Sequence, residues 1–160
     1  MYKITALLLV LLPFNSFGQD VLTPEHEVAL KPEHAKSLLN QCSRSTPKNI
    51  SDSWAVSDSE ISQIHEHFNK LKSLKSSGCC IEGLKLNSLD AYAFQYLGVT
   101  IKKRRYIYVN AFFVDPEYFE EWYKEWEIKP MVFCDGGESF WGVLFDLERS
   151  KFEQLNINGI

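Results

Sequence analysis

Hydrophobic residues alternate with polar or small residues along the C-terminal half of the chain, the period of a strand that buries one face. Tyr92, Phe94 and Tyr96 show this period, and Val99 and Ile101 continue it. The stretch at 105–113 carries large apolar side chains on both faces, so we expect a central strand or a face that binds something. In all, the pattern predicts about five strands, at residues 91–101, 105–113, 131–134, 139–147 and 152–157.

Helical spacing replaces this alternation between residues 57 and 75. Ser57 followed by Glu60 forms a capping box, which predicts where the helix begins. Apolar residues then recur every three or four positions, at Ile61, Ile64, Phe68, Leu71 and Leu74. They predict one long amphipathic helix that ends near Lys75. A proline at a first helical position predicts two short helices, over residues 32–42 and 115–126.

These elements predict an α+β fold with one domain. Short links between the strands favour antiparallel pairing. We therefore expect an antiparallel sheet of about five strands, with the long amphipathic helix packed on one face and two short helices beside it. The expected boundaries are a signal peptide at 1–18, a flexible lead-in at 19–31 and a single α+β domain at 32–160.

The first residues have the pattern of an export signal. Lys3 precedes an apolar run from Ala6 to Leu12, and Ser16 and Gly18 are small residues at the positions that a signal peptidase reads. The run is much shorter than the roughly 20 residues that a membrane helix needs. We expect cleavage before Gln19, a periplasmic or secreted protein, and no membrane insertion once the signal is removed.

Charge and cysteine content bear on the class of binding partner and on disulfide formation. The chain has 17 basic and 21 acidic residues, so no electrostatic attraction to nucleic acid is expected. Four cysteines in an exported chain suggest disulfides. Cys42 and Cys134 lie beside predicted ordered elements, and this pairing is favoured. Cys79 and Cys80 are neighbours in a predicted loop and either bond to each other or stay reduced.

No residue pattern assigns a catalytic group. His65 and His67 stand two apart on a helix and do not face each other, which argues against a metal site. Cys134 ends a predicted strand, but an export signal argues against a reactive thiol there. A pair of carboxylates could serve a glycosidase, and the C-terminal hairpins contain Asp135, Glu138, Asp146 and Glu148. No metal or cofactor is expected.

Several short motifs occur together in the chain: Cys-Asp-Gly-Gly at 134–137, Phe-Trp-Gly-Val at 140–143, Phe-Asp at 145–146 and Phe-x-x-Leu-x-x-Asn-Gly at 152–159. Upstream, residues 41–44, Trp54 and residues 106–112 fit the same pattern. Together they resemble a group of small, exported bacterial proteins of unassigned function. The resemblance implies a compact exported domain and no particular reaction, and the Cys79–Cys80 pair is an addition to it.

Two functions of different classes fit these observations. The favoured one is a non-catalytic exported protein that binds another envelope or extracellular protein, as an inhibitor or an immunity-type protein would. Its expected binding surface is aromatic and consists of Tyr106, Tyr108, Phe112, Trp122, Trp126 and Trp141. For the aromatic set Trp122, Tyr123, Trp126 and Trp141, a place in the core is the favoured alternative. The alternative is a small-ligand-binding protein or a hydrolytic enzyme with a pocket between helix and sheet. If the face that carries Tyr106, Tyr108 and Phe112 is covered in the fold, binding through that face is excluded.

Overall fold

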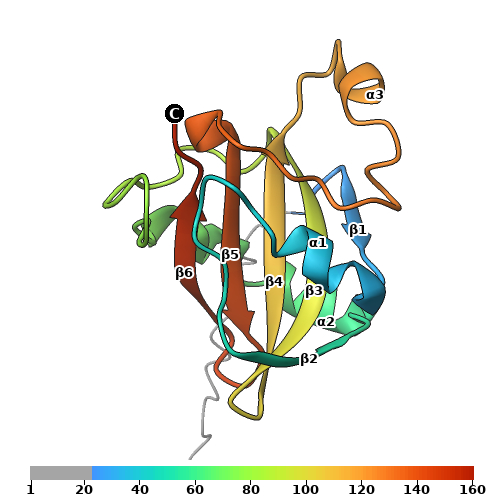
Figure 1. Ribbon diagram of the computed structural model, residues 1–160, viewed down its shortest axis with the longest axis vertical. Coiled ribbons are helices and arrows are strands. Elements are labelled where there is room, and N and C mark those ends of the chain that lie inside the picture. The colour runs from blue at the N-terminus through green and yellow to red at the C-terminus, as the bar shows by residue number, and fades with distance from the viewer. Residues whose placement is uncertain (1–22) are drawn as a thin grey trace, which may run out of the picture.

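The computed structural model describes residues 23–160, so the expected signal peptide lies outside the described residues. Its centre is one six-stranded sheet (Figure 1). The order across the sheet is β1-β3-β4-β5-β6, and β2 also pairs with β3. The strands are β1 (Glu27–Ala29), β2 (Ile50–Trp54), β3 (Tyr92–Ile101), β4 (Arg104–Phe113), β5 (Phe140–Asp146) and β6 (Lys151–Ile157).

The expectation of five antiparallel strands is wrong, because two short strands add to the edge at β3 and one of them is parallel. β1 runs parallel to the first half of β3, with Val28 opposite Gln95. β2 runs antiparallel to the second half, with Trp54 opposite Gly98. β1 lies inside the expected flexible lead-in, so the ordered chain begins earlier than residue 32. The expected strand at 131–134 is absent from the described sheet.

The helices are all short, and the predicted long amphipathic helix is wrong. They are η1 (Pro32–His34), α1 (Ala35–Leu38), α2 (Asp58–His65), η2 (Phe68–Ser73), α3 (Phe119–Trp122) and η3 (Gly137–Ser139). The predicted capping box is present at the start of α2. After His65 the hydrogen bonding changes, since the His67 N–H donates to Ile64 O, three residues back, at 2.9 Å, and Nδ1 of His67 contacts Gln63 O at 3.0 Å. The tighter 3₁₀ geometry of η2 follows.

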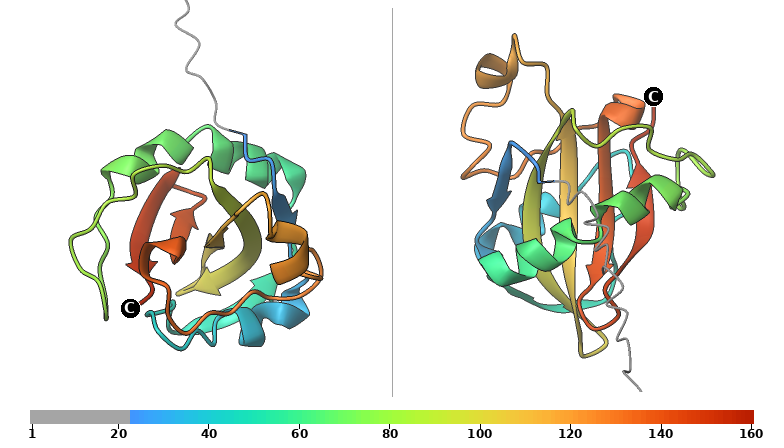
Figure 2. Two further views of the ribbon diagram at one scale, coloured as in Figure 1. Left: turned by 90° about the horizontal axis from the view of Figure 1, so that it is seen from above. Right: turned by 180° about the vertical axis from the view of Figure 1, so that it is seen from behind.

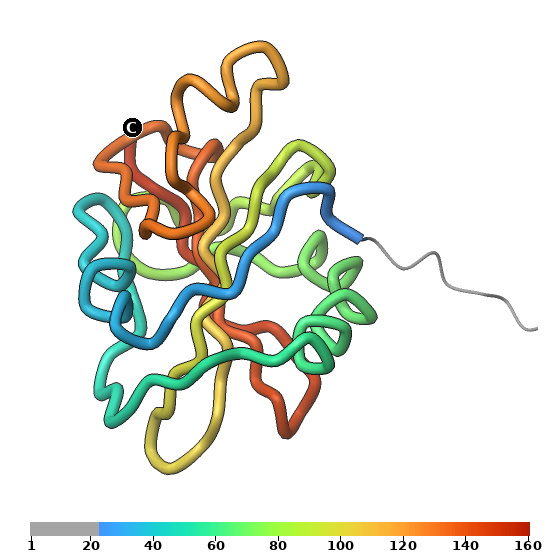
Figure 3. The backbone as a smooth tube through the Cα atoms, turned by 90° about the vertical axis from the view of Figure 1, so that its right-hand side faces the viewer, coloured from blue at the N-terminus to red at the C-terminus, as the bar shows by residue number. Residues whose placement is uncertain are grey.

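Both faces of the sheet are covered (Figure 2). On the back, residues 58–89, named here the back cover, place Ile64, Phe68 and Leu71 against the sheet, and all three are fully buried. On the front, α1 and the segment 114–135, named here the front cover, lie over the opposite face (Figures 1 and 3). This double covering explains why β4 is apolar on both sides.

The described residues contain no helix long and apolar enough to cross a membrane.

Candidate functional site

The predicted aromatic surface does not exist as one exposed surface. Trp122 is 60% exposed, and the other five predicted residues are buried: Tyr106, Tyr108, Phe112, Trp126 and Trp141. Trp141 faces the back cover, where its ring lies 5.9 Å from that of Phe94, while Phe112 packs under the front cover, 5.0 Å from Tyr123. Binding through the face of Tyr106, Tyr108 and Phe112 is therefore excluded in this fold.

The base of the front cover is fixed by buried amide side chains that rise from the sheet. Gln95 Nε2 donates to Trp126 O at 2.6 Å and to Lys129 O at 2.7 Å. Asn110 Nδ2 donates to Met131 O at 3.0 Å and to the Gln95 Oε1 atom at 3.0 Å. These bonds satisfy backbone carbonyls that no strand partner reaches, so an irregular segment can lie against a buried surface.

Arg44 completes this network from the loop that follows α1. Its side chain is buried, and the guanidinium donates to Tyr108 Oη at 3.2 Å and Asn158 Oδ1 at 2.8 Å, and also to Asn110 Oδ1. Asn158 in turn donates to Phe133 O at 2.9 Å. All three partners of Arg44 are neutral acceptors, so the group works as a multiple donor in the packing of the front cover.

The favoured disulfide is present and joins the same two regions. Cys42 and Cys134 form a bond across 92 residues, which links the end of α1 to the base of the front cover. Cys79 and Cys80 are free and exposed. The loop that the Cys42–Cys134 bond closes is long, and in the chain-entropy account such a bond stabilises the fold by about 4–5 kcal/mol.

The segment at 113–132 is named here the acidic tip. Its last part, from Trp126, takes part in this base, and its part around α3 stands out past the end of the sheet (Figures 1 and 3). Among the described residues it contains five of the six large apolar side chains that are exposed: Phe113, Tyr118, Trp122, Ile128 and Val132. The rings of Tyr118 and Trp122 stack 4.9 Å apart. A hydrogen bond with Glu117 raises the pKa of the Tyr118 phenol, which stays neutral near pH 7. Tyr118 and Trp122 thus form an exposed aromatic pair, and exposed apolar groups of this kind mark interaction sites.

Charge is concentrated at the same place. The acidic tip has six carboxylates and two lysines, a net charge of −4, which equals the net charge of the whole chain. Its carboxylates are Asp115, Glu117, Glu120, Glu121, Glu125 and Glu127. The opposite end of the sheet has the basic run Lys102–Arg105 at the turn between β3 and β4. There Arg104 pairs with Asp146 and Glu148, and Arg105 pairs with Glu60. The acidic tip keeps its net charge of −4 and attracts cationic surfaces.

A groove of about 520 Å³ opens beside the tip, and it is named here the tip groove. Aromatic rings of Tyr92, Phe113 and Phe119 line it together with the carboxylates Glu25, Asp90 and Glu120. Burial raises the pKa of the Tyr92 phenol, whose hydroxyl donates to Glu138 O at 2.8 Å. Aromatic faces with acids beside them suit an Arg or Lys side chain of a partner.

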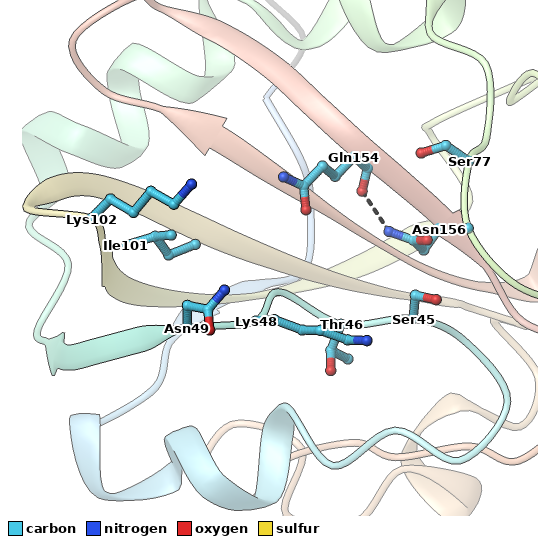
Figure 4. Close-up of a pocket in the computed structure, with 10 residues that line it drawn as sticks. Ser45, Thr46, Lys48, Asn49, Ser77, Ile101, Lys102, Gln154 and Asn156 are labelled. Carbon is cyan, nitrogen blue, oxygen red and sulfur yellow. Dashed lines mark hydrogen bonds between the residues drawn. The ribbon is translucent and has the colours of Figure 1, made fainter.

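A second groove, of about 380 Å³, lies between β6 and the loop before β2, and it is named here the lysine groove (Figure 4). Its lining includes Lys48 and Lys102 with the amides Asn49, Gln154 and Asn156. The residues that line it include no carboxylate, imidazole or thiol. Its chemistry therefore suits the binding of an anionic polar group rather than acid–base catalysis.

The sequence also offered Cys134 and four C-terminal acids as candidate catalytic groups. Cys134 is bonded and cannot act as a nucleophile. Asp146 is fully buried at the end of β5 and accepts from Arg104 and from the backbone N–H groups of Glu148 and Arg149. Asp135 and Glu138 precede the other end of β5, so the four acids do not face one another across a cleft.

His65, at the end of α2, also has a structural partner. His65 Nε2 lies 2.7 Å from Glu27 Oε2, which ties α2 to β1. Among residues 23–160 no group of three or more His, Cys, Asp or Glu side chains is arranged to hold a metal ion. The space between α2 and the sheet, where the alternative function places its pocket, is occupied by the side chains of Ile64 and Phe68.

The acidic tip was only partly visible in the sequence. Trp122 was among the predicted binding residues, but the tip groove was not predicted, because Glu25 and Asp90 are distant from residue 113 in the chain. The density of acids between residues 115 and 127 was the one available signal. Comparisons with protein-family models, with curated proteins and with solved structures found no match.

Proposed function

We propose that this protein is an exported, non-catalytic protein that binds another protein of the envelope or extracellular space through its acidic tip. One observation carries the proposal: the exposed large apolar side chains of the described chain gather on the tip, with Trp122 at 60% exposure. Tyrosine and tryptophan anchors of this kind dominate the energy of protein interfaces. An inhibitor or an immunity-type protein is the form of binding protein that best suits a small domain of this kind.

The export part of the proposal rests on the N-terminal pattern and on the Cys42–Cys134 bond. Disulfides persist in oxidising compartments and are uncommon in the cytosol. The bond also fixes the base of the tip to α1, and the buried amides Gln95 and Asn110 hold the rest of that base. A fixed base loses little conformational entropy when a partner docks, which favours affinity.

The charge of the tip defines the chemistry of the partner. Its net charge of −4 attracts a basic surface, and the tip groove offers aromatic faces flanked by carboxylates for an Arg or Lys side chain. The partner we propose therefore presents a basic patch with apolar residues inside it. Its binding weakens as salt rises, because exposed charges are screened within about 10 Å at 0.1 M ionic strength.

A capture experiment with matched variants tests this proposal. The immobilised full-length protein, processed as exported, is exposed to the envelope and culture-medium fractions of its source organism. The parent is compared with Tyr118→Ser/Trp122→Ser, and with Ile160→Ser, which removes an exposed apolar side chain outside the tip. We expect the parent and Ile160→Ser to retain the same protein and the tip variant to lose at least about 90% of it. Equal retention by all three would rule out the tip as the interface.

A further inference from the structure

Cys79 and Cys80 lie outside the acidic tip, in the loop between η2 and β3, and the proposed function does not use them. Both are exposed, and their Sγ atoms are 2.6 Å apart. A reagent in solution can reach either thiol, and each thiol can reach the other.

The loop that contains the pair is held in a fixed position against β6. The Ser77 N–H donates to Leu155 O at 2.7 Å, and Ile81 forms a bridge with Ile157. Gly78 has φ +106°, and a side chain there would come within 2.2 Å of Asn156 Oδ1. Cys80 also has a positive φ, of 85°. The two thiols are therefore presented by backbone that glycine and the contacts with β6 keep in place.

The two thiols are not equivalent. The Cys80 thiol donates a hydrogen bond to Cys79 Sγ, and this bond, with one from Ser45, lowers the pKa of Cys79. The same contact raises the pKa of Cys80. A thiolate, not a thiol, attacks a disulfide. Cys79 also follows Gly78 directly and contacts Ser45 through its N–H, whereas Cys80 Sγ lies 2.6 Å from Cys79 Sγ. Cys79 is therefore assigned as the group that attacks first, and Cys80 as the group that resolves the product.

The lysine groove lies next to the cysteine pair. Gly78, the residue before Cys79, is part of its lining, and so is Ser45, whose Oγ accepts a hydrogen bond from the Cys79 N–H at 3.3 Å. Figure 4 shows Ser45, Ser77 and Asn156 at one end of the groove and Lys102 at the other. A molecule that reacts at Cys79 can therefore place carboxylates among polar groups and two ammonium groups.

We infer that Cys79 and Cys80 form a thiol–disulfide exchange site for small-molecule disulfides that carry carboxylates. In the first step the Cys79 thiolate attacks one sulfur of the disulfide, whose S–S bond breaks and releases one thiolate. In the second step Cys80 loses its proton and attacks Cys79 Sγ, and the other thiolate leaves. Two electrons pass from the protein to the small disulfide, and the two released thiolates take up protons. The reverse sequence reduces the vicinal disulfide with two thiols.

The first test uses glutathione disulfide and single-cysteine variants of the full chain. The protein is reduced until Cys79 and Cys80 titrate while the Cys42–Cys134 bond remains, as peptide mapping verifies. We expect the parent to end as a product lighter by two hydrogens, with no glutathione attached. Cys80→Ser retains glutathione as a stable mixed disulfide, and Cys79→Ser reacts about threefold more slowly than Cys80→Ser, because the hydrogen bond with Ser45 that lowers the thiol pKa belongs to Cys79. Glutathione retained on the parent, or equal rates for the two variants, would overturn the inference.

The second test addresses the charge of the substrate. Lys48→Gln/Lys102→Gln is compared with the parent in reactions with glutathione disulfide and with the neutral bis(2-hydroxyethyl) disulfide. Lys103→Gln is the control, since Lys103 lies in the same turn but does not line the groove. We expect about a fivefold slower reaction of the double variant with glutathione disulfide and an unchanged rate with the neutral reagent. An unchanged rate with both reagents would overturn the assigned substrate class. Neither test involves the proposed protein partner.

Discussion

The two covers of the sheet are held to it by different kinds of contact. The centre of the back cover is held by apolar packing, since the ring of Phe68 lies 5.1 Å from Phe94 and 6.0 Å from Phe152, and hydrogen bonds such as that of Gln63 with Leu147 O hold its margins. The front cover is held at its base by amide hydrogen bonds and a disulfide. A cover that is held by apolar packing must keep its apolar side chains against the sheet. A cover that is held by hydrogen bonds and a disulfide can leave some of its apolar side chains exposed.

This difference explains how the acidic tip can carry aromatic residues on its surface. Tyr123 and Trp126 pack on Phe112 and belong to the front core. Trp122 and Ile128, each 60% exposed, have no such role, because the base is already fixed by Gln95, Asn110 and Cys134. The exposed set is therefore available to a partner at little cost to the fold.

The largest expected effect comes from the disulfide of the front cover. The double variant Cys42→Ala/Cys134→Ala should lower the free energy of unfolding by about 4–5 kcal/mol, because the unfolded chain regains the freedom of a long loop. Urea denaturation measures this loss, and hydrogen exchange should locate the earliest opening at residues 126–135. The control is Cys79→Ser/Cys80→Ser, which should change stability by less than about 1 kcal/mol. A similar loss in both double variants would contradict the role given to this bond.

A nearly equal effect is expected on the other side of the sheet. Phe68→Ala leaves a cavity among buried rings, and such truncations cost about 3–5 kcal/mol. Lys70→Ala, an exposed position in η2, is the matched control and should stay within about 0.5 kcal/mol of the parent. In contrast to the disulfide variant, hydrogen exchange should increase in α2 and η2 before it increases in the front cover. Earlier opening of the front cover would remove the distinction between the two.

Asn110→Ala should have a smaller effect, located in the polar base. It removes the donor to Met131 O and to Gln95 Oε1 and the acceptor of Arg44, so three groups lose a partner, at a cost of about 2 kcal/mol. Asn87→Ala removes an exposed amide and should change stability by no more than about 0.5 kcal/mol. Chemical denaturation compares the two variants. If Asn110→Ala were as stable as the parent, the amide network would not be what fixes the front cover.

The smallest effect on stability is expected for the tip itself. The Trp122 side chain is 60% exposed, so Trp122→Ser removes few buried contacts and leaves the base unchanged. Its free energy of unfolding should therefore match that of the parent within about 0.5 kcal/mol. Thermal or urea denaturation provides the value. A loss above about 2 kcal/mol would show that Trp122 belongs to the core, in conflict with its exposure.

Much of the sheet could be predicted because strands β3 to β6 are long and strongly periodic, and the start of α2 because Ser57 and Glu60 form a local cap. The strands β1 and β2 were missed. Each is short and partly polar, and they are defined by pairing with β3 rather than by their own pattern. The apolar spacing continues through His67, where the structure changes from α-helix to 3₁₀ hydrogen bonding, so that spacing did not predict the break. Which aromatic residues stay exposed depends on the path of the front cover, which no periodicity encodes.

The affinity of the captured partner for tip variants tests the central claim most directly. Titration calorimetry would compare the parent, Trp122→Ser and Ile160→Ser, all in the full chain. If Trp122 is an anchor of the interface, its loss should weaken binding by about 2 kcal/mol or more, roughly thirtyfold in Kd. Ile160→Ser should bind as the parent does. A Kd for Trp122→Ser equal to that of the parent would contradict the claim that the acidic tip is the binding surface.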